Sequence, residues 1–120
     1  MPRYTEFQSC IGMVKWWAFY SRINKLPEHL LFHCPNQSMG GPRHGHNLKL
    51  MGVRAGTPDY MLAVARGPYH GMFLEIKSLD GRVSPEQKET MLNLTNQGYL
   101  VVLCRGAEEA RLQIEAYLSK

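Results

Sequence analysis

Two short apolar runs that suit β-strands, residues 59–65 and 72–77, constrain the fold of this chain more than any other feature. Residues 66–71 lie between them and hold two glycines and Pro68, residue types that favour a reversal of the chain. Strand-like runs joined in this way predict a β-hairpin. The 120 residues are enough for one domain with a core and too few for two, so we expect a single domain over residues 1–120.

The hairpin would bring polar side chains from both strands to one place. Side chains alternate between the faces of a strand, so Glu75 and Lys77 share one face while Ile76 takes the other. A hairpin folded about Pro68 would set Asp59 opposite Lys77, and opposed residues point to the same face. We therefore expect Asp59, Glu75 and Lys77 to converge.

Two carboxylates and an ammonium in one place suit metal-dependent hydrolysis of a phosphodiester. The carboxylates hold a hard divalent cation, and the lysine stabilises charge on a phosphate or an attacking water. Each residue also has an ordinary interpretation. Asp59 could be a solvated turn residue after Pro58, and Glu75 with Lys77 could protect an edge strand from aggregation. The residues taken singly leave both interpretations open.

Helices and further strands are predicted on both sides of the hairpin. Phe7, Ile11 and Val14 recur at helical spacing, and Thr5 with Gln8 fits a capping box, so residues 5–20 should form a helix. Further elements are a strand at 30–34, helical turns at 46–51, a helix from Ser84 and Pro85 to Gly98, a strand at 99–104 and a helix at 107–118. The order α-β-β-β-α-β-α predicts an α/β fold with a small mixed β-sheet flanked by helices.

The composition indicates the class of protein and its cellular environment but does not determine its function. Hydrophobic residues make up 44% of the chain and charged residues 20%, as in ordinary globular proteins. The net charge of +4 suits a polyanionic partner such as DNA but does not require one. Three widely spaced cysteines form neither a zinc motif nor a disulfide framework, which favours a reducing cytoplasm. No apolar run reaches spanning length, so no membrane association is expected.

Several motifs together resemble a known group of enzymes. Asp59, the run Glu75-Ile76-Lys77 and Gln87 resemble the core of the PD-(D/E)XK nuclease superfamily, and the chain is more closely similar to its VRR-Nuc (virus-type replication-repair nuclease) family. Supporting pieces are Glu6 and Gln8 in the first helix, Pro35 and Asn36 before a glycine-rich loop, residues 52–59, residues 81–88 and residues 97–99. The similarity extends from about residue 6 to residue 118. It implies a restriction-endonuclease-like fold and a metal-dependent deoxyribonuclease activity.

The resemblance also implies roles for the converging residues. Mg²⁺, for which Mn²⁺ can substitute, would be bound by Asp59, Glu75 and the backbone carbonyl of Ile76. The metal would polarise the phosphodiester and lower the pKa of a bound water. Lys77 would orient that water or neutralise charge in the transition state.

Two further residues are catalytic candidates by resemblance, and each has a local alternative. Glu6 would add a carboxylate near the metal, directly or through water, although the helix dipole alone favours an acidic residue in a first turn. Gln87 would brace the metal or its water. Ser84 and Gln87 also stand at the two positions of a capping box, and we expect that both roles cannot be fully occupied at once.

Basic residues on either side of the hairpin are candidate contacts to DNA phosphates, with solvated surface charge as the alternative. They are Arg43, Lys49 and Arg54 before it, and Arg82 and Lys88 after it.

The resemblance leads to an expectation about the substrate. It implies a role in phage or bacterial DNA repair, replication or recombination, in the cytoplasm of a bacterium or a phage-infected host. The favoured hypothesis is a homodimer that cuts branched DNA as a four-way-junction resolvase does, because two copies would set paired cuts on symmetric strands. The alternatives are a DNA-binding module that has lost catalysis and a nonspecific or flap nuclease.

Overall fold

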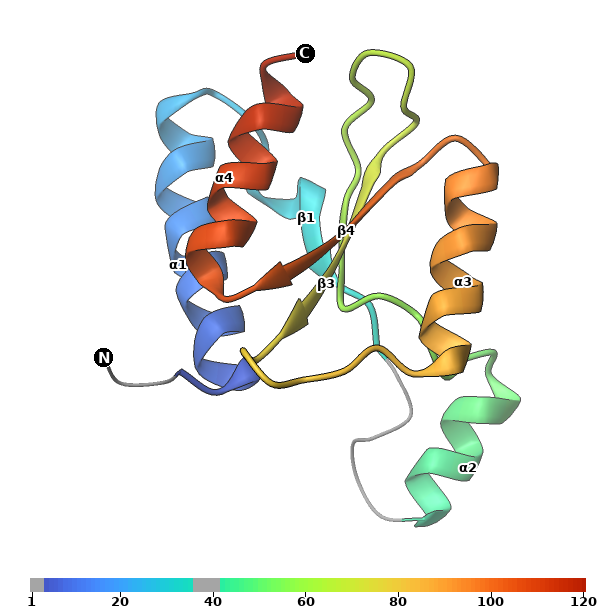
Figure 1. The fold of residues 1–120 in the computed structure, drawn as a ribbon. Helices are drawn as coiled ribbons and strands as arrows, with labels where there is room; N and C mark the ends of the chain where they lie inside the picture. Colours follow the sequence, from blue (N-terminus) through green and yellow to red (C-terminus); the bar gives the residue numbers. More distant parts are fainter. Residues whose placement is uncertain (1–3, 36–41) are drawn as a thin grey trace.

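The computed structural model describes residues 4–35 and 42–120, with the side chains of residues 42–44 outside the description (Figure 1). The elements are α1 (Glu6–Ile23), the 3-10 helix η1 (Glu28–Leu30), β1 (Leu31–His33), α2 (Pro42–Leu50), β2 (Tyr60–Leu62), β3 (Met72–Lys77), α3 (Pro85–Asn96), β4 (Leu100–Arg105) and α4 (Ala107–Leu118). The predicted α/β fold, a small mixed sheet flanked by helices, is confirmed. The expected order omits α2, which is a helix of 9 residues rather than one or two turns.

The four strands form one sheet in the order β1-β2-β3-β4. β1 pairs with β2 and β2 pairs with β3 in antiparallel fashion, while β3 and β4 are parallel. The pairing of β2 with β3 is the predicted hairpin. No helix of the described residues is long and apolar enough to cross a bilayer.

The expected register of the hairpin is wrong by two residues. Tyr60 pairs with Leu74, so the same register brings Asp59 level with Glu75 rather than with Lys77. The reversal is centred near Gly67, which has a φ of +53°, and the chain closes across the bridge between Arg66 and Tyr69. Beyond that bridge, residues 63–65 face only residues 70–71 before the ladder resumes, a one-residue offset. A shift of two residues preserves the faces, so the predicted convergence survives.

The two faces of the sheet are covered by different helices. α1 and α4 lie together against one face, and α3 lies on the other side (Figure 1). Met72, Leu74 and Ile76 of β3 are fully buried on the side of α1 and α4. The alternate residues of β3 therefore point toward α3, and the acidic residue Glu75 is among them.

Helix α1 does not bury the stripe whose spacing predicts it. Its core face consists of Ser9, Met13, Trp17 and Ser21. Phe7, Ile11 and Val14 are 73%, 39% and 42% exposed. Their spacing predicts the helix correctly, but its packing against α4 and β3 selects another face for the core.

Candidate active site

The end of the β2–β3 hairpin holds the three residues that the sequence predicts will converge. The Ile76 amide donates a hydrogen bond of 2.8 Å to Oδ2 of Asp59. Nζ of Lys77 lies 3.2 Å from Oε2 of Glu75. The residue just before β2 and a residue of β3 thus supply one carboxylate each, and Lys77 places a cation beside Glu75.

Gln87, in the first turn of α3, performs two tasks that we expected to exclude each other. Its side-chain Oε1 accepts a hydrogen bond from the backbone amide of Ser84 at 2.9 Å. The backbone amide of Gln87 donates to Oγ of Ser84 at 3.1 Å, which completes a capping box. Its Nε2 donates to Oε2 of Glu75 at 2.8 Å. The expectation of exclusion is wrong, because the oxygen of the amide serves the cap while its nitrogen serves the carboxylate.

The segment before β2 fits closely against the same helix. At Gly56 a Cβ atom would lie 2.8 Å from the backbone carbonyl of Glu86, and the φ of Gly56 is +86°. Glycine is therefore required there on two counts, by contact and by backbone conformation. The contact holds residues 56–58 and the first turn of α3 together around Glu75 and Asp59.

Burial raises the pKa values of both carboxyls in the site. Glu75 is only 2% exposed, and burial first, then the charge of Asp59, raises its pKa to about 7 despite the opposing charge of Lys77. Burial likewise raises the pKa of Asp59, against the hydrogen bond from the Ile76 amide. Two carboxylates with one ammonium leave an excess of negative charge, which a bound cation would relieve.

One buried atom of the site fits a metal ligand. Oε1 of Glu75 is buried and has no hydrogen-bond partner among the described residues. A buried carboxylate oxygen without a partner lowers the stability of the fold unless a cation or a hydrogen-bond donor contacts it. Carboxylate and carbonyl oxygens are the donors that Mg²⁺ prefers. The donors at this position therefore fit the predicted cation.

The Ile76 carbonyl has the orientation that the predicted ligand set needs. Both backbone groups of a residue in an extended strand point to the same side, and the Ile76 amide points at Asp59. The carbonyl therefore also points away from β4 toward the side of Asp59.

The described residues contain no group of three or more His, Cys, Asp or Glu side chains arranged to hold a metal. A cation here would accordingly depend on Asp59, Glu75 and backbone or water oxygens.

Glu6 lies at the margin of the site. It is the first residue of α1, and its side chain is exposed. Its Oε1 comes close to the loop after β3, since a Cβ atom on Gly81 would lie 3.2 Å from it. After burial, the charge of Glu6 is a smaller cause that raises the pKa of Asp59. Glu6 is thus close enough for its charge to act on Asp59, but it forms no metal-holding group of three acidic side chains within the described residues.

Four of the predicted DNA-binding residues have exposed side chains. They are Lys49 of α2, Arg54 before β2, Arg82 before α3 and Lys88 in α3. Arg43 belongs to α2, but its side chain lies outside the described part of the structure. Their assignment to phosphate binding stays a prediction.

Sequence reasoning missed Arg105, the last residue of β4. It lies level with Lys77 in the parallel pairing. Its guanidinium Nη1 donates to the backbone carbonyls of Ser78, Leu79 and Gly81, at 2.7, 3.2 and 2.7 Å. Arg105 therefore fixes the loop that follows Lys77. The available signal is a single charged residue at the end of an otherwise apolar strand.

Comparison with known proteins agrees with this geometry. A family model of the VRR-NUC domain matches residues 14–108, a range that includes Asp59, Glu75, Lys77 and Gln87 but not Glu6. A solved structure described as a VRR_NUC domain protein is 29% identical to the chain, with a TM-score of 0.81. The match covers 98% of this chain and 91% of the other. A search among curated proteins finds no match.

Proposed function

Since the chain belongs to the VRR-NUC family, whose domain is of the nuclease type, we propose that it is a Mg²⁺-dependent DNA endonuclease. One observation carries the proposal. The buried, unpartnered Oε1 of Glu75 lies in a site where Asp59 supplies a second carboxylate and Lys77 a cation. Two carboxylates and a lysine can hold a metal ion and stabilise charge during phosphodiester hydrolysis. Without a bound cation, the buried carboxylate oxygen destabilises the fold.

The residues divide the work of the reaction. Asp59, Glu75 and the Ile76 carbonyl would hold Mg²⁺, which when bound polarises the phosphate and acidifies a water. Gln87 and Lys77 both contact Oε2 of Glu75, so the other oxygen, Oε1, is left for the metal. Lys77 also stabilises the charge that develops on the attacking water or on the phosphate.

Surrounding residues would position the DNA. Glu6 would hold water at the edge of the site, because its charge acts on Asp59 from the start of α1. Arg43, Lys49, Arg54, Arg82 and Lys88 would contact phosphates on either side of the scissile bond. Mn²⁺ is expected to replace Mg²⁺, as both prefer oxygen ligands.

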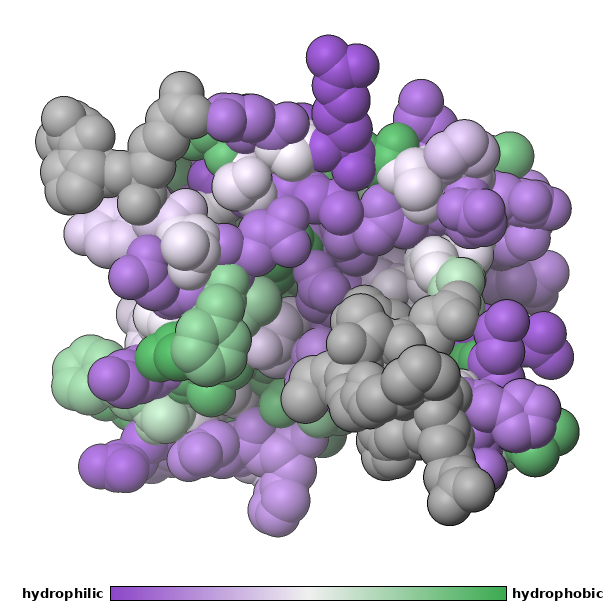
Figure 2. Space-filling view, turned by 90° about the horizontal axis from the view of Figure 1, so that it is seen from below, coloured by the Kyte–Doolittle hydropathy of each residue, from purple (hydrophilic) through white to green (hydrophobic). Residues whose placement is uncertain are grey.

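The favoured substrate is branched DNA, in phage or bacterial repair, replication or recombination, cut by a homodimer. The exposed residues Phe7, Ile11 and Val14 form a stripe at coiled-coil spacing on α1, which suits packing against a second helix. Figure 2 shows hydrophobic residues gathered on the side of the molecule where α1 and α4 lie, amid a mainly hydrophilic surface. A twofold dimer would carry two active sites, as paired cuts across a junction require.

The activity is tested by incubating the protein with labelled four-way junctions, flaps and linear duplex, with and without Mg²⁺. We expect cutting that needs the metal and is faster on branched DNA. Absence of cutting with Mg²⁺ and with Mn²⁺ would leave the inactive DNA-binding module as the better reading. Equal cutting of all three substrates would favour the nonspecific nuclease.

The dimer is tested by the mass of the protein in solution. We expect a dimer at micromolar concentration and a monomer for Ile11→Glu, which puts a charge in the middle of the apolar stripe. Leu92→Glu changes an exposed leucine of α3 in the same way and should leave the dimer intact. A monomeric parent protein would refute paired cutting by two copies.

A further inference from the structure

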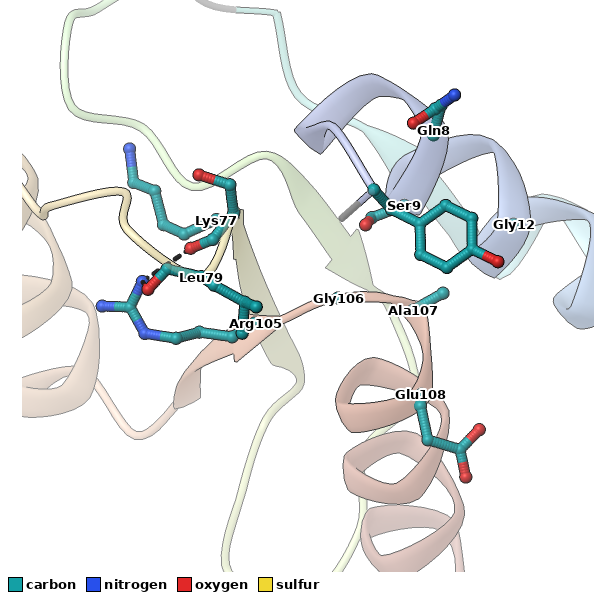
Figure 3. A pocket seen from close by; sticks show the side chains of 11 residues that line it. Gln8, Ser9, Gly12, Lys77, Leu79, Arg105, Gly106, Ala107 and Glu108 are labelled. Carbon is teal, nitrogen blue, oxygen red and sulfur yellow. Dashed lines mark hydrogen bonds between the residues drawn. The ribbon is translucent and has the colours of Figure 1, made fainter. Parts of the chain in front are cut away.

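A cavity of about 550 Å³ opens beside the site, between the first turns of α1 and α4 and the loop after β3 (Figure 3). Lys77 belongs to its lining, so the cavity and the site share one residue. Its volume falls within the roughly 300–1,000 Å³ of sites for small organic ligands. The proposed chemistry, which takes place at Asp59 and Glu75, does not use the remainder of this space.

The walls of the cavity suit a flat, largely apolar group. Tyr4 is 68% exposed and Leu79 is 63% exposed, and both line the cavity. Gly12 of α1 and Ala107 of α4 lie on facing walls, and a Cβ atom on Gly12 would meet the Cβ atom of Ala107 at 3.4 Å. The small residues let the two helices meet closely at this point, where they close one side of the cavity. An exposed aromatic ring at the rim offers a surface for stacking.

The charged groups of the lining favour an anion at one end of the cavity. The Arg105 guanidinium is engaged with the carbonyls of the loop after β3. The Glu108 carboxylate is paired with Arg111 of its own helix. Lys77, whose ammonium lies 3.2 Å from Oε2 of Glu75, is the cation of the lining that borders the candidate active site. A suitable ligand has a flat apolar part and a phosphate beside Lys77.

We propose that the cavity receives the base of one unpaired nucleotide next to the phosphate that is cut. This inference rests on the proposed nuclease activity, because that activity defines which phosphate is cut. Tyr4 would stack on the base, an interaction that tolerates any sequence because every base has a π-face. An unpaired base leaves its stack at lower cost than a paired one. Fully paired DNA could not fill the cavity without losing a base pair, so among branched DNAs the cavity favours those with an unpaired nucleotide at the branch point.

The test measures affinity for two oligonucleotide duplexes that differ in one group. Each carries a single unpaired residue at a branch point, a normal nucleotide in one and an abasic residue in the other. Ca²⁺ replaces Mg²⁺ so that the DNA stays intact. The parent protein should bind the base-containing duplex at least about fivefold more tightly. Tyr4→Ala should abolish this ratio, and Tyr4→Phe, which keeps the ring, should retain it.

Two further variants separate the cavity from the general surface. Ala107→Leu fills the cavity and should also abolish the ratio, with thermal unfolding to verify its fold. Leu112→Ala removes an exposed apolar side chain of α4 outside the cavity and should retain the ratio. Equal affinity of the parent for both duplexes would overturn the inference. So would a ratio that persists in both Tyr4→Ala and Ala107→Leu. Failure to cut any DNA in Mg²⁺ would refute the nuclease activity but not a base preference seen in Ca²⁺.

Discussion

Helices α1 and α3 begin with the same local motif, yet only the motif of α3 bonds to a carboxylate of the candidate active site. Thr5 and Gln8 form a capping box on α1, and Ser84 and Gln87 form one on α3. The bond lengths agree, with 2.9 and 3.1 Å in each box. The two glutamines therefore have the same local role.

The two boxes differ in what the side-chain amide nitrogen of the glutamine contacts. Nε2 of Gln87 reaches the buried Glu75, whereas Nε2 of Gln8 has no hydrogen-bond partner among the described residues. The contrast comes from the placement of α3 over the carboxylate-bearing face of β3. A local motif becomes part of a site only when the fold brings its spare donor to an acceptor that needs it.

The largest effect is expected from removing the carboxylate that Gln87 serves. Glu75→Gln keeps the shape of the side chain but removes its charge, so Mg²⁺-dependent cleavage should fall by about 10³-fold or more. Glu6→Gln, at the start of the other helix, should lower it by only about tenfold, as expected for a group that acts through water. Single-turnover cleavage of a four-way junction measures both. Equal losses would place Glu6 among the direct ligands.

A smaller effect is expected when the bridging amide alone is removed. Gln87→Ala should lower kcat by about 10- to 100-fold with little change in KM, because its Nε2 donates to Glu75, which we propose as a ligand of the metal. Thr5→Ala weakens the cap of α1 and is the matched control, with less than about threefold loss of kcat. A Gln87→Ala variant that raises KM and leaves kcat unchanged would assign Gln87 to DNA binding instead.

The pH dependence of stability tests whether the charged carboxylate of the buried Glu75 destabilises the fold when no metal is bound. Burial, followed by the charge of Asp59, raises the pKa of Glu75 from 4.5 to about 7. The folded protein then holds a proton that the unfolded chain releases, so the unfolding free energy is largest below about pH 4.5 and falls as the pH rises to about 7. The loss should be about 1–3 kcal/mol after allowance for solvent screening.

The measurement is urea unfolding in chelator between pH 4.5 and 8. Mg²⁺ should restore stability above pH 7, because a cation favours the charged carboxylates. Glu75→Gln should remove most of the pH dependence, and Asp59, whose pKa is also raised, should account for the remainder. A parent protein whose stability rises with pH over this window would contradict the buried, repelling pair.

The sequence predicts the local features of this site better than its tertiary contacts. The hairpin, the helix start at Ser84 and the shared face of Glu75 and Lys77 follow from turn chemistry, capping and strand alternation. The register depends on the turn at Gly67 and the offset beyond it, a detail that strand pattern does not encode. The core face of α1 also escapes prediction, because the helix packed against it decides which stripe is buried.

Arg105 escapes prediction for a different reason. Its partners are three backbone carbonyls, and every residue offers a carbonyl, so no pairing of side-chain types reveals the contact. The resemblance makes Gln87 a candidate site residue, but the sequence does not reveal that its partner is Glu75. Both contacts become visible only once β4 and α3 are placed beside β3.

The smallest expected effect concerns the caps themselves. Ser84→Ala and Thr5→Ala each remove the side chain that accepts from the third residue of the helix, so each should lower the unfolding free energy by about 1 kcal/mol. Only Ser84→Ala should also lower cleavage, by a few-fold, because a loosened first turn lets Gln87 swing away from Glu75. Urea unfolding and single-turnover cleavage of both variants give the comparison. Matching losses of cleavage would mean that the two caps support the site equally and that the contact to Glu75 has no separate role.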